Sequence, residues 1–325
     1  MSMPLIALEE HFFSALVPDA LKLSYLEQLK HIPDVYDKLR DLSAQRLQDM
    51  SAGNISLQVI SHAPGLHDPG ACRAANNELA GAVKADGPLK GRIAGLAVAP
   101  MGKPLLAAAE LRRAVNELGF VGALVDNHFN GVFYDGPEYG PWWEAVEELD
   151  VPVYLHPTWP SDEMALRYQG NFSNAAARSL GSSGLGWHTE TGMHLLRLFA
   201  SGLFDRRPRL KIILGHMGET IPFMLDRIQA LSKRWGDIQR DFKTVYDENV
   251  WITTSGVWSI DPLRCILANT KLDHILYSVD YPFQRNEVGL EWMRELEHSG
   301  LVDKEQIQAI AFRNAERLLG IKAST

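Results

Sequence analysis

Short apolar runs recur along the whole chain, and most of them have the length of a buried β-strand rather than of a buried helix. They are Leu5–Leu8, Ile55–Ile60, Ile93–Ala99, Gly122–Val125, Val151–Leu155, Leu210–Leu214, Val250–Thr253 and Ile275–Val279. Several are rich in Val and Ile, and continuous apolar runs of this kind are typical of parallel strands that are buried on both faces. We therefore expect a central parallel sheet with eight strands.

Helical patterns lie between these runs. They are Leu105–Leu118, Trp142–Leu149, Thr189–Phe204 and Lys304–Leu319, and Gly119 and Gly320 mark the ends of the first and the last. An alternation of strand and helix repeated eight times predicts an α/β fold, the (β/α)8 or TIM barrel. An open doubly wound sheet is the alternative, but no Gly-rich phosphate loop follows the first strand.

Two predicted connections are long. Residues 12–54 follow the first strand and contain helical stretches, and residues 157–187 follow the fifth strand and are rich in Gly, Ser and Asn. Long loops after barrel strands usually cover the active face, although a flexible surface insertion is the alternative for 157–187. No repeat, low-complexity segment or linker divides the chain, so we expect residues 1–325 to form one barrel domain.

Composition narrows the classes of partner. The 325 residues are 46% hydrophobic and 22% charged, which is typical of a soluble globular protein. The net charge is −8 without a basic tract, which argues against a nucleic-acid or anionic-membrane partner. The longest apolar run, 93–101, is far below the ~18 residues of a membrane span, and the start of the chain lacks the basic region of a signal peptide. Cys72 and Cys265 form neither a disulfide framework nor a metal knuckle, so we expect a cytoplasmic protein.

Polar residues end the first and fifth predicted strands. Glu9 and His11 lie two residues apart and should share one face of the strand, while Glu10 points the other way. His156 ends an apolar strand directly before Pro157. Carboxylate and imidazole groups at the carboxyl ends of barrel strands suit a divalent metal site. Taken singly, each is as well explained by a hydrogen-bonded strand end or a core histidine.

The sixth and eighth strands end in a similar way. His216 lies between Gly215 and Gly218, and Glu219 follows at a spacing that could orient its imidazole for acid–base chemistry. Asp280 emerges from an apolar strand and needs a cation or hydrogen-bond donors. Helix capping is the alternative role for both acidic residues. The coincidence of all these groups at strand ends nevertheless predicts one metal site.

Four motifs carry a resemblance to a known family. They are Ala7-Leu8-Glu9-Glu10-His11-Phe12, Tyr154-Leu155-His156-Pro157, the run 213–219 and Ser278-Val279-Asp280-Tyr281-Pro282-Phe283. Together they resemble the amidohydrolase-related decarboxylases, above all the o-hydroxybenzoate decarboxylases that act on γ-resorcylate, 2,3-dihydroxybenzoate or 5-carboxyvanillate. The resemblance runs over almost the whole chain, including the connecting segments 117–125, 190–198 and 252–256.

This resemblance implies a full set of site residues. One divalent ion, Zn²⁺ or Mn²⁺, would be held by Glu9, His11, His156 and Asp280, and no organic cofactor would be needed. His216 and Glu219 match the family's catalytic pair, whereas Arg227 and Arg46 match arginines assigned to substrate binding. Relatives of this kind are commonly homodimers or homotetramers.

Three departures from the family pattern concern the substrate. Asp126 stands where relatives usually have Asn, and Thr158 stands where close relatives have Arg. A carboxylate at position 126 would repel an anionic substrate unless it is protonated or paired. His67 and His128 also differ from the commonest pattern. Phe12, Trp159 and Phe283 are expected to wall the substrate ring, with ordinary core packing as the alternative.

The expected activity is therefore the non-oxidative, reversible decarboxylation of a small aromatic carboxylate. Asp280 is the first candidate for protonating the ring carbon, and His216 is the second. A metal-dependent hydrolase or hydratase on the same barrel is the main alternative. A binding protein without chemistry is a further one, but the intact set of site residues disfavours it.

Overall fold

Eight strands form the centre of the computed structural model, which describes residues 3–323. They are β1 Ile6–Phe12, β2 Leu57–His62, β3 Ile93–Gly95, β4 Ala123–Asp126, β5 Pro152–His156, β6 Lys211–Leu214, β7 Val250–Thr253 and β8 Ile275–Leu276. Neighbouring strands pair in parallel, in the order β1-β2-β3 and β4-β5-β6-β7-β8. The strand order thus follows the order of the sequence throughout.

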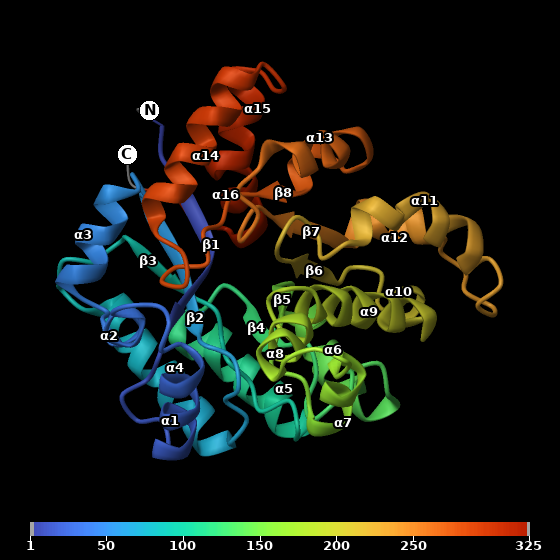
Figure 1. Ribbon diagram of the computed structural model, residues 1–325, viewed down its shortest axis with the longest axis horizontal. Coiled ribbons are helices and arrows are strands. Elements are labelled where there is room, and N and C mark those ends of the chain that lie inside the picture. The colour runs from blue at the N-terminus through green and yellow to red at the C-terminus, as the bar shows by residue number, and fades with distance from the viewer. Residues whose placement is uncertain (1–2, 324–325) are drawn as a thin grey trace.

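Two single pairings join these two sheets into a closed ring. Ala97, just after β3, pairs with Ala123 of β4, and Leu8 of β1 pairs with Ser278 beyond β8. The backbone N–H of Ala97 donates to the Gly122 carbonyl at 2.9 Å, and that of Leu8 donates to the Tyr277 carbonyl at 3.3 Å. The structure is therefore the predicted (β/α)8 barrel, with the strands enclosed by helices (Figure 1).

Helices fill every connection between strands. In chain order they are α1 Asp19–Gln28, α2 Val35–Arg40, α3 Ala44–Ala52, α4 Pro69–Lys84, α5 Pro104–Arg113, α6 Gly140–Leu149, α7 Asp162–Ala165, α8 Asn174–Gly181, α9 Gly186–Ala200, α10 Leu203–Arg206, α11 Ile221–Ser232, α12 Phe242–Asn249, α13 Ile260–Asn269, α14 Asn286–Ser299, α15 Lys304–Gln308 and α16 Asn314–Leu319. Over residues 3–323, no helix combines the length and the apolar character that crossing a membrane requires.

Several predicted elements differ in detail. The strands predicted over 93–99 and 275–279 are shorter, because only β3 and β8 at their starts keep regular pairing. The helix predicted over 189–204 is wrong as one element: α9 ends at Ala200, and Gly202, with a φ of 70°, separates it from α10. The helices predicted to end at Gly119 and Gly320 do end there, with φ values of 81° and 66°, although each contains a π-helical turn.

An apolar plug fills one end of the barrel. Seven strands contribute to this buried cluster, through Ile6, Leu8, Val59, Ala94, Leu124, Tyr154, Ile213 and Leu276. Side chains from so many strands can meet only inside the ring, where bulky branched residues form packed layers. The polar strand ends described below lie next to this cluster, toward the carboxyl ends of the strands, so they are supported by tightly packed apolar side chains.

Candidate active site

Four side chains, three of them buried and that of Asp280 half-buried, converge at the carboxyl ends of three strands. Glu9 and His11 come from β1, His156 ends β5, and Asp280 follows β8. The Nε2 atom of His11 lies 3.3 Å from Oδ1 of Asp280, and Nε2 of His156 lies 3.4 Å from Oε1 of Glu9. These four atoms are buried and have no hydrogen-bond partner in the described part of the chain. Buried polar atoms left unpaired together call for a missing ligand or ion.

The backbone at both carboxylates is unusual. Glu9 has a φ of 71° and Asp280 a φ of 72°, in the left-handed region that costs a non-glycine residue about 1 kcal/mol or more. The register of β1 against β2 shifts between Ala7 and Glu10, which is where Glu9 lies. The hydroxyls of Ser255 and Ser278 donate to Oε2 of Glu9, so Oε1 is the oxygen that faces the histidines. Such strain persists where the surroundings hold a residue in place for function.

The electrostatics of this group fit a cation. Burial, reinforced by the Glu9 carboxylate, raises the pKa of Asp280 to about 8. Burial lowers the pKa of His11 to about 4 and that of His156 in the same direction, so both imidazoles are neutral. Neutral imidazoles and carboxylate oxygens are the ligands that Zn²⁺ and Mn²⁺ accept. Ligand atoms around a tetrahedral ion, each about 2.1 Å from it, lie about 3.4 Å apart. The His11–Asp280 and His156–Glu9 pairs have this spacing, and ligand atoms of His11, His156 and Asp280 all lie within 4.8 Å of one another.

A second cluster joins the first on the side of β6. The turn after β6 places His216, Met217, Glu219 and Thr220 at positive φ, and the Met217 N–H donates to the Thr253 carbonyl at 2.8 Å. Nδ1 of His216 lies 2.7 Å from Oε1 of Glu219 and 3.7 Å from Oε1 of Glu9. Although burial opposes both changes, the pKa of Glu219 falls to about 2 beside His216 and His188, and the pKa of His216 rises to about 10 beside the two glutamates.

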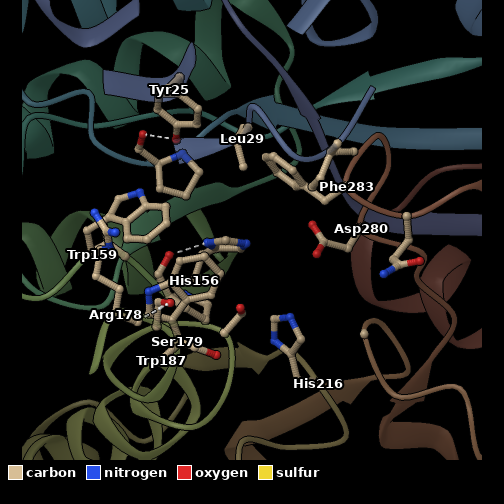
Figure 2. A pocket seen from close by; sticks show the side chains of 18 of the residues that line it. Tyr25, Leu29, His156, Trp159, Arg178, Ser179, Trp187, His216, Asp280 and Phe283 are labelled. Carbon is tan, nitrogen blue, oxygen red and sulfur yellow. Dashed lines mark hydrogen bonds between the residues drawn. The ribbon is translucent and has the colours of Figure 1, made fainter. Parts of the chain in front are cut away.

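A cavity of about 690 Å³ opens onto both clusters. His156, His216 and Asp280 form part of its wall, and Figure 2 shows Asp280 and Phe283 facing the side occupied by Trp159 and Trp187. Most of the remaining wall comes from the two long connections, through residues that include Tyr25, Leu29, Ile32, Thr158, Arg178, Ser179, Ser182 and Ser183. Both connections therefore cover the strand ends, as the sequence predicts, and 157–187 contains α7 and α8.

The residues expected to wall the substrate divide into two groups. Trp159 lines the cavity and packs edge-on against Trp187, with ring centroids 4.9 Å apart. Phe283 lines it as well, 5.5 Å from the ring of His11. Phe12 does not lie among the described lining residues, because its ring is buried against His62 at 5.3 Å. Phe12 is therefore packed in the core, which is the alternative to a place in the substrate wall.

Asp126 is not among the described residues that line the cavity. Its Oδ2 atom lies 3.0 Å from Nε2 of His67 and accepts a hydrogen bond of 2.8 Å from the Gly65 N–H. Burial raises the pKa of Asp126, but these two partners lower it further, to below its ordinary value. The carboxylate is therefore paired inside the protein. Thr158 does line the cavity, and its N–H donates to Asn127 at 3.2 Å.

The structure places the two predicted substrate-binding arginines outside the described cavity lining. Arg46 is completely buried, and its guanidinium donates to the His11 carbonyl at 2.6 Å and to Oε1 of Gln58 at 3.1 Å. It also lies over the ring of Tyr281, 4.9 Å from the centroid. Arg227 lies on the exposed side of α11. In this chain Arg46 thus holds the ends of β1 and β8 together.

Two residues of the site are not predicted from the sequence. His188 lines the cavity, and its Nδ1 atom lies 2.7 Å from Oε2 of Glu219, while Ser255 donates to Glu9. The partners of these contacts are 31 and 246 residues apart in the sequence, so no local spacing announces them. The position of His188, directly after the Gly- and Ser-rich segment, is the one available signal.

The family assignment rests on the fold, the site and a direct match. A family model described as amidohydrolase matches residues 27–321, and the chain belongs to this amidohydrolase family.

Two curated relatives and one solved structure show what the chain is similar to. It is 52% identical to the decarboxylase orsB of Emericella nidulans, over 99% of this chain and 98% of that protein. It is 37% identical to a γ-resorcylate decarboxylase of Rhodococcus jostii, over 88% of this chain and 91% of that protein. A dihydroxybenzoic acid decarboxylase from Polaromonas sp. JS666, solved with bound manganese and the inhibitor 2-nitroresorcinol, superposes with a TM-score of 0.84 at 33% identity, covering 98% of this chain and 97% of that one.

Proposed function

We propose that this protein is a divalent-metal-dependent decarboxylase of an o-hydroxybenzoate. The observation that carries the proposal is the convergence of four unpaired, buried ligand atoms from Glu9, His11, His156 and Asp280. The relatives support it, since those named above are decarboxylases and the Polaromonas structure holds manganese. The proposed activity is thus that of a carboxy-lyase with a divalent metal ion as its cofactor.

The metal would be Mn²⁺ or Zn²⁺, held by these four side chains. When bound, the ion would supply a positive charge that stabilises the anionic substrate in the site. Ser255 and Ser278 hold Oε2 of Glu9, which fixes the direction of the remaining oxygen. These serines act on the orientation of a ligand, and such support is commonly as important to a metal site as the ligands themselves.

The reaction itself needs one proton at the ring carbon that bears the carboxyl group. The new C–H bond forms there, the C–C bond to the carboxylate breaks, its electron pair restores the aromatic ring, and CO2 leaves. Asp280 is our first choice of donor because it lines the cavity and has a second oxygen that can carry a proton. His216 is the second, since it faces the same space (Figure 2). Its Nδ1 atom lies 2.7 Å from Oε1 of Glu219.

The remaining walls bind the ring and exclude water. Trp159, Trp187 and Phe283 offer apolar faces to an aromatic substrate. Thr158 takes the place where close relatives have an arginine, so the positive charge available to an anionic substituent comes from Arg178 and Lys30 at the wall of the cavity. Exclusion of water strengthens the attraction between the substrate and the charges of the site.

The test is a decarboxylation assay in D2O. The protein, purified without chelators and supplied with Mn²⁺ or Zn²⁺, is incubated with 2,6-dihydroxybenzoate, 5-carboxyvanillate and 6-methylsalicylate, with 3-hydroxybenzoate as the matched control lacking an ortho-hydroxyl. We expect CO2 release from at least one ortho-hydroxylated acid, one deuterium at the vacated ring carbon, and no turnover of the control. Metal binding without CO2 release from any of them would contradict the proposal and favour a hydrolase or hydratase.

A further inference from the structure

The carboxylate of Glu219 is shared between two histidine rings. Its Oε1 atom lies 2.7 Å from Nδ1 of His216, and its Oε2 atom lies 2.7 Å from Nδ1 of His188. The Glu219 side chain is completely buried, so these rings are its principal partners. Each carboxylate oxygen therefore has one imidazole, and the orientation of the carboxylate depends on both.

The direction of the hydrogen bonds follows from chemistry. An ionised carboxylate can only accept, so both Nδ1 atoms carry a proton and donate to Glu219. His216 is thereby fixed with its Nε2 edge turned away from Glu219, on the side of the cavity that Asp280 also lines (Figure 2). The ring centroids of His188 and His216 are 4.8 Å apart. The two rings thus pack against each other as well as against the carboxylate.

His188 also connects this pair to the segment that covers the cavity. It lies in the first turn of α9, directly after residues 157–187, and its Nε2 atom lies 3.2 Å from the Ser183 carbonyl oxygen. One ring therefore bridges the covering segment and Glu219. His216 and Glu219 lie in a turn where non-glycine residues hold positive φ, so their placement depends on such outside contacts.

We propose that His188 is a positioning residue: it fixes the Glu219 carboxylate, and through it the His216 ring, against the covered cavity. The inference rests on the proposed decarboxylase function. A residue that orients another acts mainly in the transition state, so its loss lowers kcat and leaves KM nearly unchanged. Removal of a supporting hydrogen bond of this kind typically costs about 10–100-fold in activity.

The test compares three variants. His188→Ala removes the donor, and His188→Asn keeps an N–H near the position of Nδ1. His298→Ala is the matched control, because His298 is an exposed histidine whose Nδ1 atom lies 2.6 Å from the Arg294 carbonyl of its own helix. We expect His188→Ala to lose about 10–100-fold in kcat with KM changed by less than about 3-fold. His188→Asn should recover most of that loss, and His298→Ala should match the wild type. Metal content, measured in all three, should stay the same.

A second readout does not depend on turnover. In the zinc-loaded protein with ¹⁵N-labelled histidine, two imidazole N–H resonances should be shifted downfield by their bonds to Glu219. His188→Ala should remove one and move the other, assigned to His216, whereas His188→Asn should leave the His216 signal near its original place. If the wild type proves inactive on every hydroxybenzoate, these spectra still test the positioning of Glu219.

Four outcomes would overturn the inference. They are an unchanged kcat in His188→Ala, a rise in KM with kcat preserved, a His188→Asn variant as impaired as His188→Ala, and a His216 resonance that does not move in His188→Ala. The second of these would make His188 a substrate contact instead.

Discussion

Replacement of the buried Arg46 by methionine discriminates between two roles for this residue. The sequence resemblance assigns Arg46 to the substrate, whereas the structure buries it completely and directs its guanidinium to the His11 carbonyl, Oε1 of Gln58 and the Asp41 carbonyl. Arg46→Met keeps an unbranched apolar stem and removes all three bonds. The structural role predicts a loss of stability, and the substrate role predicts a loss of affinity.

The magnitude follows from the acceptors that the variant leaves unpaired. The His11 carbonyl and the Gln58 oxygen are buried, and each unmade hydrogen bond costs about 1–3 kcal/mol. The contact of Arg46 with the Tyr281 ring contributes about 1 kcal/mol more. We therefore expect the free energy of unfolding to fall by about 4 kcal/mol.

Urea unfolding of the wild type and Arg46→Met measures this change, with Arg264→Lys as the control. Arg264 lies on the exposed side of α13, so its variant should stay within about 0.5 kcal/mol of the wild type. Because the His11 carbonyl loses its donor, the remaining folded Arg46→Met should also bind metal less tightly. Wild-type stability together with a KM raised about tenfold or more, which is about 1.4 kcal/mol, would refute the structural role and return Arg46 to the substrate.

Three further changes test other parts of the site and the fold. Asp280→Asn should reduce turnover by about 100-fold or more while the circular dichroism spectrum is retained, and a metal-loaded variant with wild-type rates would exclude Asp280 as the proton donor. Gly215→Ala places a Cβ 2.7 Å from Oε1 of Glu9, so the affinity for the metal should fall about tenfold or more, as measured by calorimetric titration. Gly81→Ala is the control: its Cβ has open space around it, so the metal affinity should stay unchanged. His194, whose Nε2 accepts the Tyr134 N–H at 3.2 Å, has a pKa lowered by burial to about 3, with smaller effects from Asp135, His128 and Arg197. As pH falls below about 6.5, His194 therefore takes up a proton in the unfolded chain but not in the folded one. The free energy of unfolding of the wild type should then decline relative to that of His194→Gln by about 1.4 kcal/mol per pH unit, or about 2 kcal/mol between pH 6.5 and pH 5. If the urea midpoints of the two proteins change by the same amount over that pH range, folding does not keep His194 neutral.

The strands and the strand-end residues are the part of this structure that sequence reasoning reaches. An apolar run such as Val151–Leu155 has few alternatives to a buried strand, and the barrel topology then brings His156 to the same end as Glu9 and Asp280. Alternation along β1 also predicts that Glu9 and His11 share a direction, and both contact His156. Glu10 instead accepts from the Val279 and Tyr281 N–H groups.

Contacts made by side chains across loops lie beyond such reasoning. Arg46 is one of several charged residues in 12–54, and nothing in its neighbours indicates that it is completely buried. Asp126 is paired by His67, which is 59 positions away in the sequence. The predicted helix breaks at Gly202 because this glycine has a left-handed conformation. Many helices contain a glycine in ordinary helical conformation, so the sequence does not show which of the two Gly202 adopts. In each case the three-dimensional neighbours decide the outcome.

One titration tests the metal site and the chemistry together. The protein is stripped with a chelator, and CO2 release from the best o-hydroxybenzoate substrate is followed as Mn²⁺ is added. We predict no activity in the stripped protein and a linear recovery that ends at one ion per chain. The same titration of His156→Asn, which replaces one of the four proposed ligands, should recover little activity at that ratio. Full activity without metal, or an unchanged titration in His156→Asn, would contradict the assignment of Glu9, His11, His156 and Asp280 as the metal site of a decarboxylase.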